Sequence, residues 1–188
     1  MATPPTFTSG SILTSAQMNA VGWWLIGSQS FSGATQVDFS NVFSSSYQTY
    51  RIEFENLTAS TGDDFFMKFR SAAGLISTTD YLTMRNEVTD GSNAAFYAGG
   101  GYASALRPTY IEAGSATMRS TGNMEIFNPN LADYTNTSST FSRIGNSIYV
   151  VNATGFFRLT TQLTGFSFVR GGSGTISGKA SVYGYRNS

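Results

Sequence analysis

The sequence predicts an all-β protein: an antiparallel β-sandwich, jelly-roll-like, with an extended N-terminal arm and one short N-terminal helix. After residue 22, apolar and polar side chains alternate with a period of two, which is typical of strands with one buried face. Glycine, asparagine and serine separate these segments, and strands do not alternate with helices, which favours antiparallel sheets. We therefore expect an attachment segment over residues 1–22 and a β-sandwich body over residues 23–188.

The attachment segment is expected to contain an arm and then a helix. Two adjacent prolines near the N-terminus fix φ and lack amide donors, so residues 2–10 are expected to be extended. A capping-box pattern at residues 14–17 begins a helix that Gly22 is placed to end. The predicted helix, residues 15–21, has about two turns and is too short to be stable without a partner surface.

The clearest predicted strand lies at residues 48–57, where Tyr50, Ile52 and Phe54 alternate with charged side chains. Residues 64–70 alternate in the same way, and the spacer between the two segments suits a hairpin loop, so we expect these two strands to pair antiparallel. Further strands are expected at residues 23–31, 37–39, 81–88, 117–128, 138–144, 147–151, 156–163, 166–169 and 174–185.

Glycine content singles out two segments. In the last strand, Gly178, Ala180 and Gly184 lie on the apolar side, which predicts that another backbone approaches closely there. Residues 90–115 combine five glycines with several aromatic side chains and are expected to form a long loop. Such a loop is usually functional or is ordered by a partner.

Composition excludes most kinds of chemistry. The chain has no histidine and no cysteine, which rules out a Ser-His-Asp triad, a cysteine nucleophile, a thiolate or imidazole metal site and disulfides. We expect no enzymatic activity, no cofactor and no metal. The 11 basic and 11 acidic residues balance, so the chain has no excess of positive charge for binding nucleic acid. No apolar run is long enough for membrane insertion. The N-terminus lacks a signal-peptide pattern, so synthesis in a cytoplasm is expected.

Few residues suggest a site. The acidic pairs Glu53/Glu55 and Asp63/Asp64 could serve a glycosidase, but their places on a polar strand face and in a turn favour solvated surface groups. Tyr97, Tyr102 and Tyr110 could stack on the sugars of a host receptor. They could equally pack in a subunit interface or cover the edge of the sandwich, because aromatic side chains are enriched in interfaces of both kinds.

Segments at both ends and in the middle of the chain resemble segments of a known class of proteins. FTSGSILTSAQMN at residues 7–19, followed by WWLI at residues 23–26, resembles the start of many tailed-bacteriophage structural proteins described as tail-fibre or minor tail proteins. FSF at residues 166–168 and GTISGKASVYGYR at residues 174–186 resemble the last strands of such proteins. FSSSYQTYRI at residues 43–52 resembles their strand after a serine-rich turn.

This resemblance implies a virion component that is often trimeric and whose N-terminal segment binds the phage particle. Its partners would be further copies of itself and other virion proteins of the capsid, tail or baseplate, with a host surface glycan as a further partner. The absence of a coiled-coil or collagen-like repeat favours a compact spike, a short fibre tip or a capsid decoration protein over a long tail fibre. The candidate attachment residues are Phe7, Ile12, Leu13, Met18, Trp23 and Trp24. The alternative is a receptor-binding or carbohydrate-binding module that uses residues 90–115.

Overall fold

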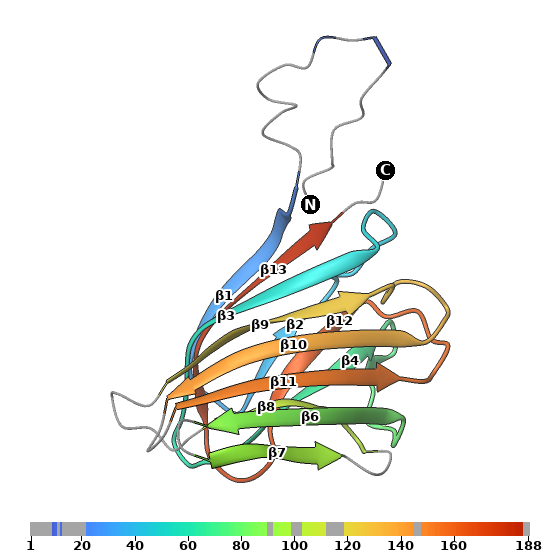
Figure 1. Ribbon diagram of the computed structural model, residues 1–188. Helices are drawn as coiled ribbons and strands as arrows, with labels where there is room; N and C mark the ends of the chain where they lie inside the picture. The colour runs from blue at the N-terminus through green and yellow to red at the C-terminus, as the bar shows by residue number, and fades with distance from the viewer. Residues whose placement is uncertain are drawn as a thin grey trace.

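The computed structural model describes residues 9–10, 12, 22–89, 92–98, 103–111, 119–144 and 148–185 (Figure 1), with the backbone alone for residues 63 and 92–98. The described part is all-β, with antiparallel sheets. It contains no helix, and therefore none that is long and apolar enough to cross a membrane. The expected helix at residues 15–21 and most of the expected arm lie outside the described residues.

The described residues form thirteen strands. Their bounds are β1 (Trp24–Ala34), β2 (Gln36–Phe39), β3 (Thr49–Ala59), β4 (Asp63–Ser71), β5 (Gly74–Leu75), β6 (Tyr81–Thr89), β7 (Ser92–Ala98), β8 (Leu106–Ile111), β9 (Arg119–Phe127), β10 (Thr135–Ile144), β11 (Ile148–Phe157), β12 (Gly165–Arg170) and β13 (Ile176–Tyr185).

The strands form two antiparallel sheets. The eight-stranded sheet has the order β1-β13-β3-β9-β10-β11-β6-β7. The five-stranded sheet has the order β2-β12-β4-β5, and β8 also pairs with β4. Figure 1 shows the large sheet in front, with β2, β12, β4 and β8 behind it. The N-terminal strands β1 and β2 therefore each lie beside a C-terminal strand, β13 and β12 respectively.

Aromatic side chains pack the two sheets face to face. Phe54 of β3 lies 5.7 Å from Phe65 of β4 and 5.0 Å from Phe168 of β12, measured between ring centroids. Phe69 of β4 lies 5.3 Å from Phe157 of β11. All five rings are almost completely buried. The apolar faces that the sequence indicated therefore meet in one core between the sheets.

The predicted hairpin between residues 48–57 and 64–70 is wrong. Both segments are strands, and their inward faces are as expected, but β3 pairs with β13 and β9 whereas β4 pairs with β12, β5 and β8. The chain crosses from one sheet to the other at residues 60–62, so that Phe54 and Phe65 face each other across the core. A period of two fixes which face is buried but does not fix the neighbouring strand.

Two other strand expectations need correction. Residues 90–115 do not form one long loop, because β7 and β8 lie within this range. The strand expected at residues 156–163 is absent, since β11 continues to Phe157 and residues 158–164 form an irregular connection. The glycines at 99–101 lie outside the described residues.

Three glycines allow close packing of neighbouring groups. At one of them, the neighbouring group is not the backbone that the sequence predicted. At Gly184, a Cβ atom would lie 2.6 Å from the ring of Tyr47, so an aromatic side chain approaches there rather than another backbone. Gly178 has a φ of 153° at a register shift between β13 and β3, and a Cβ there would lie 3.1 Å from the carbonyl oxygen of Glu55. Gly165 packs so tightly on the carbonyl of Phe39 that no side chain fits.

The two ends of the described body lie side by side. Trp24, where β1 begins, pairs with Gly184, close to the end of β13. Trp23 contacts Tyr185, with ring centroids 5.3 Å apart. We call this end of the body the terminal pole, defined by Trp23, Trp24 and Tyr185. Figure 1 shows β1 and β13 running side by side to this pole.

Candidate functional site

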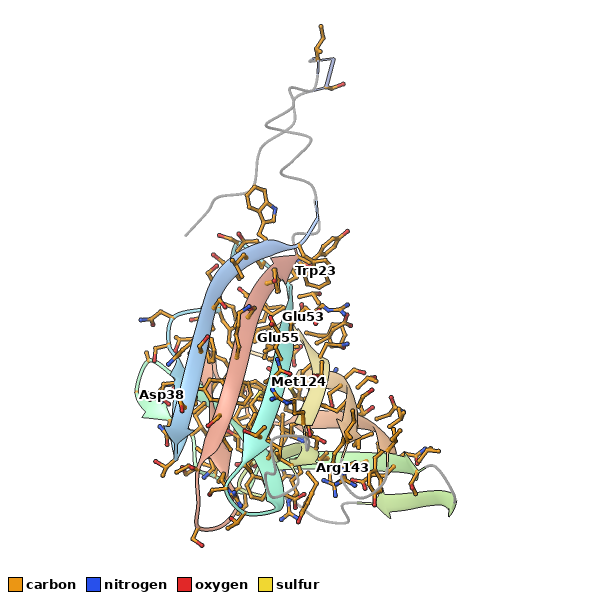
Figure 2. The ribbon with its side chains drawn as sticks, turned by 90° about the vertical axis from the view of Figure 1, so that its left-hand side faces the viewer. Trp23, Asp38, Glu53, Glu55, Met124 and Arg143 are labelled. Carbon is orange, nitrogen blue, oxygen red and sulfur yellow. The ribbon has the colours of Figure 1, made fainter. Side chains whose placement is uncertain are left out.

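The terminal pole carries the two attachment candidates nearest the body. Trp23 is 41% exposed, and Figure 2 shows it at the end of the body from which β1 starts. Trp24 is partly buried and packs against the core, so its contacts hold β1 in the sheet. Ile12 is 91% exposed. Phe7, Leu13 and Met18 lie outside the described residues.

The three candidate tyrosines do not share one exposed loop. Tyr110 lies in β8 and is partly buried, with the guanidinium of Arg143 5.2 Å from its ring centroid. Tyr97 lies in β7, where only the backbone is described, and Tyr102 is outside the described residues. Of the three, the structure therefore gives contacts for Tyr110 alone, and those contacts point toward the space between the sheets.

The outer surface of the large sheet presents an unusual face over three neighbouring strands, β10, β11 and β6. The outward side chains of all three strands are uncharged; those of β10 and β11 are exposed, and those of β6 are exposed or partly buried. We call this set the uncharged face; it comprises Leu82, Met84, Asn86, Val88, Asn136, Ser138, Thr140, Ser142, Ile144, Ile148, Val150, Asn152, Thr154 and Phe156. Half of these fourteen residues are large and apolar, and the others carry hydroxyl or amide groups.

Four of the seven apolar members of the uncharged face cluster at one end of these strands. Val150 lies opposite Val88 on the next strand, and Ile144 lies opposite Ile148. Val88 and Val150 are 43% and 42% exposed, and Ile144 and Ile148 are 51% and 54% exposed. Beside them lies a polar region, where the Thr140 hydroxyl donates a hydrogen bond of 2.9 Å to the Asn152 side chain. Leu82, Met84 and Phe156 lie at the opposite end of the face. An exposed apolar cluster bordered by polar groups is typical of a protein-binding surface.

This face was not among the features that the sequence predicted. Its signal is a lack of charge: residues 134–157 contain a single charged residue, Arg143. That arginine points inward, because Arg143 is one of the alternate residues of β10 that are buried. The outward positions of β10 and β11 therefore have no charge at all, which is rare for the surface of a globular protein.

Charged side chains gather instead between the sheets. Arg143 is only 6% exposed, and its Nη2 lies 3.5 Å from Oε2 of Glu87. Arg85 Nη1 lies 2.8 Å from Oδ1 of Asp64, and Arg85 Nε lies 3.1 Å from Oε1 of Glu87. The guanidinium of Arg143 also lies 3.8 Å from the ring centroid of Tyr149. We call Asp64, Arg85, Glu87 and Arg143 the interior ion cluster; it links β4, β6 and β10.

Glu53 and Glu55, the first candidate acidic pair, engage in surface ion pairs. Glu53 pairs with Arg51 at 2.5 Å, and Glu55 accepts a hydrogen bond of 2.8 Å from Lys179, which raises the pKa of that ammonium. Figure 2 shows Glu53 and Glu55 along β3. Asp64 lies at the start of β4 rather than in the expected turn, and it pairs with Arg85. Among the described residues, no group of three or more acidic side chains could hold a metal ion.

The architecture defines an all-β protein of two antiparallel sheets with an uncharged outer face and an exposed terminal pole. No protein-family model, curated protein or solved structure matches this chain. Function must therefore be argued from the surfaces themselves.

Proposed function

We propose that this protein is a structural component of a tailed-phage virion, a homotrimeric spike, short fibre or decoration protein without enzymatic activity. Residues 1–22 attach it to capsid, tail or baseplate proteins, and the β-sandwich body faces outward. The uncharged face is the observation that carries this proposal, because it offers an extended surface for contact with further copies of the chain. The resemblance of both ends to phage structural proteins gives the biological setting.

The order of the strands supports a jelly-roll body. A jelly roll is two packed sheets made of two Greek keys, as in many viral capsid proteins. Here the chain changes sheet between β1 and β2, between β3 and β4, and between β12 and β13. The resulting strand orders are β1-β13-β3-β9 in one sheet and β2-β12-β4-β8 in the other. In both sheets a late strand lies between two early strands, as a jelly roll requires. We call the first of these orders the first row. In this interpretation β10, β11, β6 and β7 extend the first row, and the first three of these strands carry the uncharged face.

Burial of the uncharged face between identical copies accounts for its composition. Cores of interfaces between identical subunits are apolar and poor in charged residues, with hydroxyl and amide groups supplying hydrogen bonds. The cluster of Ile144, Ile148, Val88 and Val150 would lie at the centre, and the row of Thr140 and Asn152 beside it. A charged partner finds no complementary group on this face, which favours a second copy of the chain as the occupant.

Val150→Asp is expected to convert the oligomer to a monomer. The substitution places a carboxylate beside Val88 in the apolar cluster of the uncharged face, and burying an unpaired charge in an interface costs several kcal/mol. Light scattering should show the native mass fall from about three chains to one, while circular dichroism stays unchanged. Moderate salt should not dissociate the parent oligomer, because the interface contains no ion pairs.

The control for this experiment is Thr160→Asp, which adds the same charge at an exposed position outside the uncharged face. It should keep the native mass of the parent. A monomeric parent chain, or a Val150→Asp chain that still has the parent mass, would contradict the proposal.

A chain that begins at Trp23 is expected to keep its oligomeric mass and lose attachment to the virion. All the strands and core side chains among the described residues lie after residue 22, so the truncation leaves them in place. Particles that lack the protein would be mixed with full-length or truncated chain, separated by sedimentation, and assayed for bound protein. Equal binding of the two chains would show that residues 1–22 are not the anchor.

A further inference from the structure

A groove of 530 Å³ lies on the outer surface of the five-stranded sheet. Its walls come from β2, β4, β8 and β12, with further residues from the segments at 75–79 and 103–105. Three cationic side chains line it, those of Lys68, Arg107 and Arg170, and none of its lining residues is acidic. In a chain with equal numbers of acidic and basic residues, this is a local excess of positive charge.

Two of the three cations are held in position by neighbouring groups. The guanidinium of Arg107 lies 5.2 Å from the ring centroid of Phe66, another lining residue, and Nη1 lies 3.7 Å from Oδ2 of Asp64. The Arg107 side chain is still 53% exposed, so some of its guanidinium N–H groups are accessible to a ligand in the groove. Arg170 donates a hydrogen bond of 2.6 Å from Nη1 to the carbonyl of Thr61. Side chains fixed in this way lose less entropy when they bind a ligand.

Lys68 differs from the other lysine of the chain. Lys179 pairs with Glu55 at 2.8 Å, whereas Lys68 has no ion-pair partner among the residues that the structure describes. Asp38 lies two strands away on β2: it is opposite Ser167, which lies opposite Lys68. Asp38 is engaged elsewhere, because its Oδ1 lies 3.1 Å from Nη1 of Arg70 and accepts a hydrogen bond of 2.7 Å from Ser167.

We infer that this groove binds an oligosaccharide that carries carboxylate groups. Lys68 and Arg107 pair with the carboxylates, since charge-assisted hydrogen bonds are the strongest polar contacts a protein makes with an anion. Gln36, Thr79 and Ser104 supply neutral donors and acceptors for hydroxyl groups along the same groove. The volume falls within the range of small-ligand sites, about 300–1,000 Å³. The site is separate from the uncharged face, and it does not depend on the virion role.

The test is calorimetric titration of the full chain with two acidic probes, hexagalacturonate and tetrasialic acid, and with neutral maltohexaose and inorganic phosphate. At least one acidic oligosaccharide should bind, with an affinity that falls as salt rises, and maltohexaose should not. Lys68→Gln should weaken that binding about tenfold, the effect of losing one charge-assisted contact. Lys179→Gln is the matched control, with the same change of charge on the opposite sheet, and it should bind as the parent does.

Several results would overturn the inference. The first is that neither acidic oligosaccharide binds, and the second is that Lys68→Gln and Lys179→Gln bind equally well. Inorganic phosphate that binds as tightly as the oligosaccharides would identify a simple anion site instead. A full-length chain that binds the acidic probe but fails to attach to virions would refute the proposed virion role and leave this site intact.

Discussion

Phe168→Ala is expected to lower the free energy of unfolding by about 3–5 kcal/mol, the usual cost of removing a buried phenylalanine ring. Phe168 is completely buried, and its ring centroid lies 5.0 Å from that of Phe54 and 4.9 Å from that of Phe65. Removing this ring takes away contacts with both sheets at once and leaves a cavity at their junction. Urea denaturation followed by circular dichroism, at one fixed protein concentration, measures the loss.

Leu131→Ala is the control for this measurement, because Leu131 is 53% exposed in a connecting segment. Its effect should stay within about 0.5 kcal/mol. If the two variants lose similar amounts of stability, Phe168 does not join the sheets in the way described.

Glu87→Gln is expected to cost about 3–5 kcal/mol, through a different mechanism. Glu87 is 8% exposed and lies between Arg85 and Arg143, so a neutral side chain leaves the buried Arg143 without its 3.5 Å carboxylate. Breaking a buried ion pair from one side costs more than the pair itself contributes, because the remaining charge stays desolvated. The same urea titration measures this loss.

Glu55→Gln provides the matched control, since it makes the same chemical change at an ion pair with a 50% exposed carboxylate. Exposed pairs contribute about 0–1 kcal/mol, so this variant should remain close to the parent. Equal losses for Glu55→Gln and Glu87→Gln would mean that the interior ion cluster is as well solvated as the surface.

The alternation of apolar and polar residues was sufficient to predict the strands that form the core and the face that each of them buries. Tyr50, Ile52 and Phe54 are buried as their period of two indicated, and the last strand occupies the expected range to within two residues. The partner of each strand could not be predicted in the same way, because the crossing at residues 60–62 is as short as a hairpin loop. Only the packed structure shows whether two apolar faces lie side by side or opposite each other.

The candidate site was harder to predict because β10 lacks contrast between its two faces. Its buried positions include Thr135, Thr137 and Ser139, and its outward positions carry similar polar residues until Ile144. With hydroxyl groups on both sides, hydrophobic alternation cannot distinguish inside from outside. The buried Arg143 adds to this, since a charged residue in a strand is ordinarily assigned to the surface. The groove was missed because its cations come from β4, β8 and β12, far apart in the sequence.

The terminal pole determines how this protein would respond to mechanical load. Because β1 begins where β13 ends, a force that pulls the two chain ends apart would open the β1–β13 ladder one hydrogen bond at a time, starting at Trp24 and Gly184. A force between the N-terminus and the far end of the body would instead load many hydrogen bonds of this ladder together, in shear. A body tethered through residues 1–22 and pulled at its far end therefore meets the load in its more resistant direction.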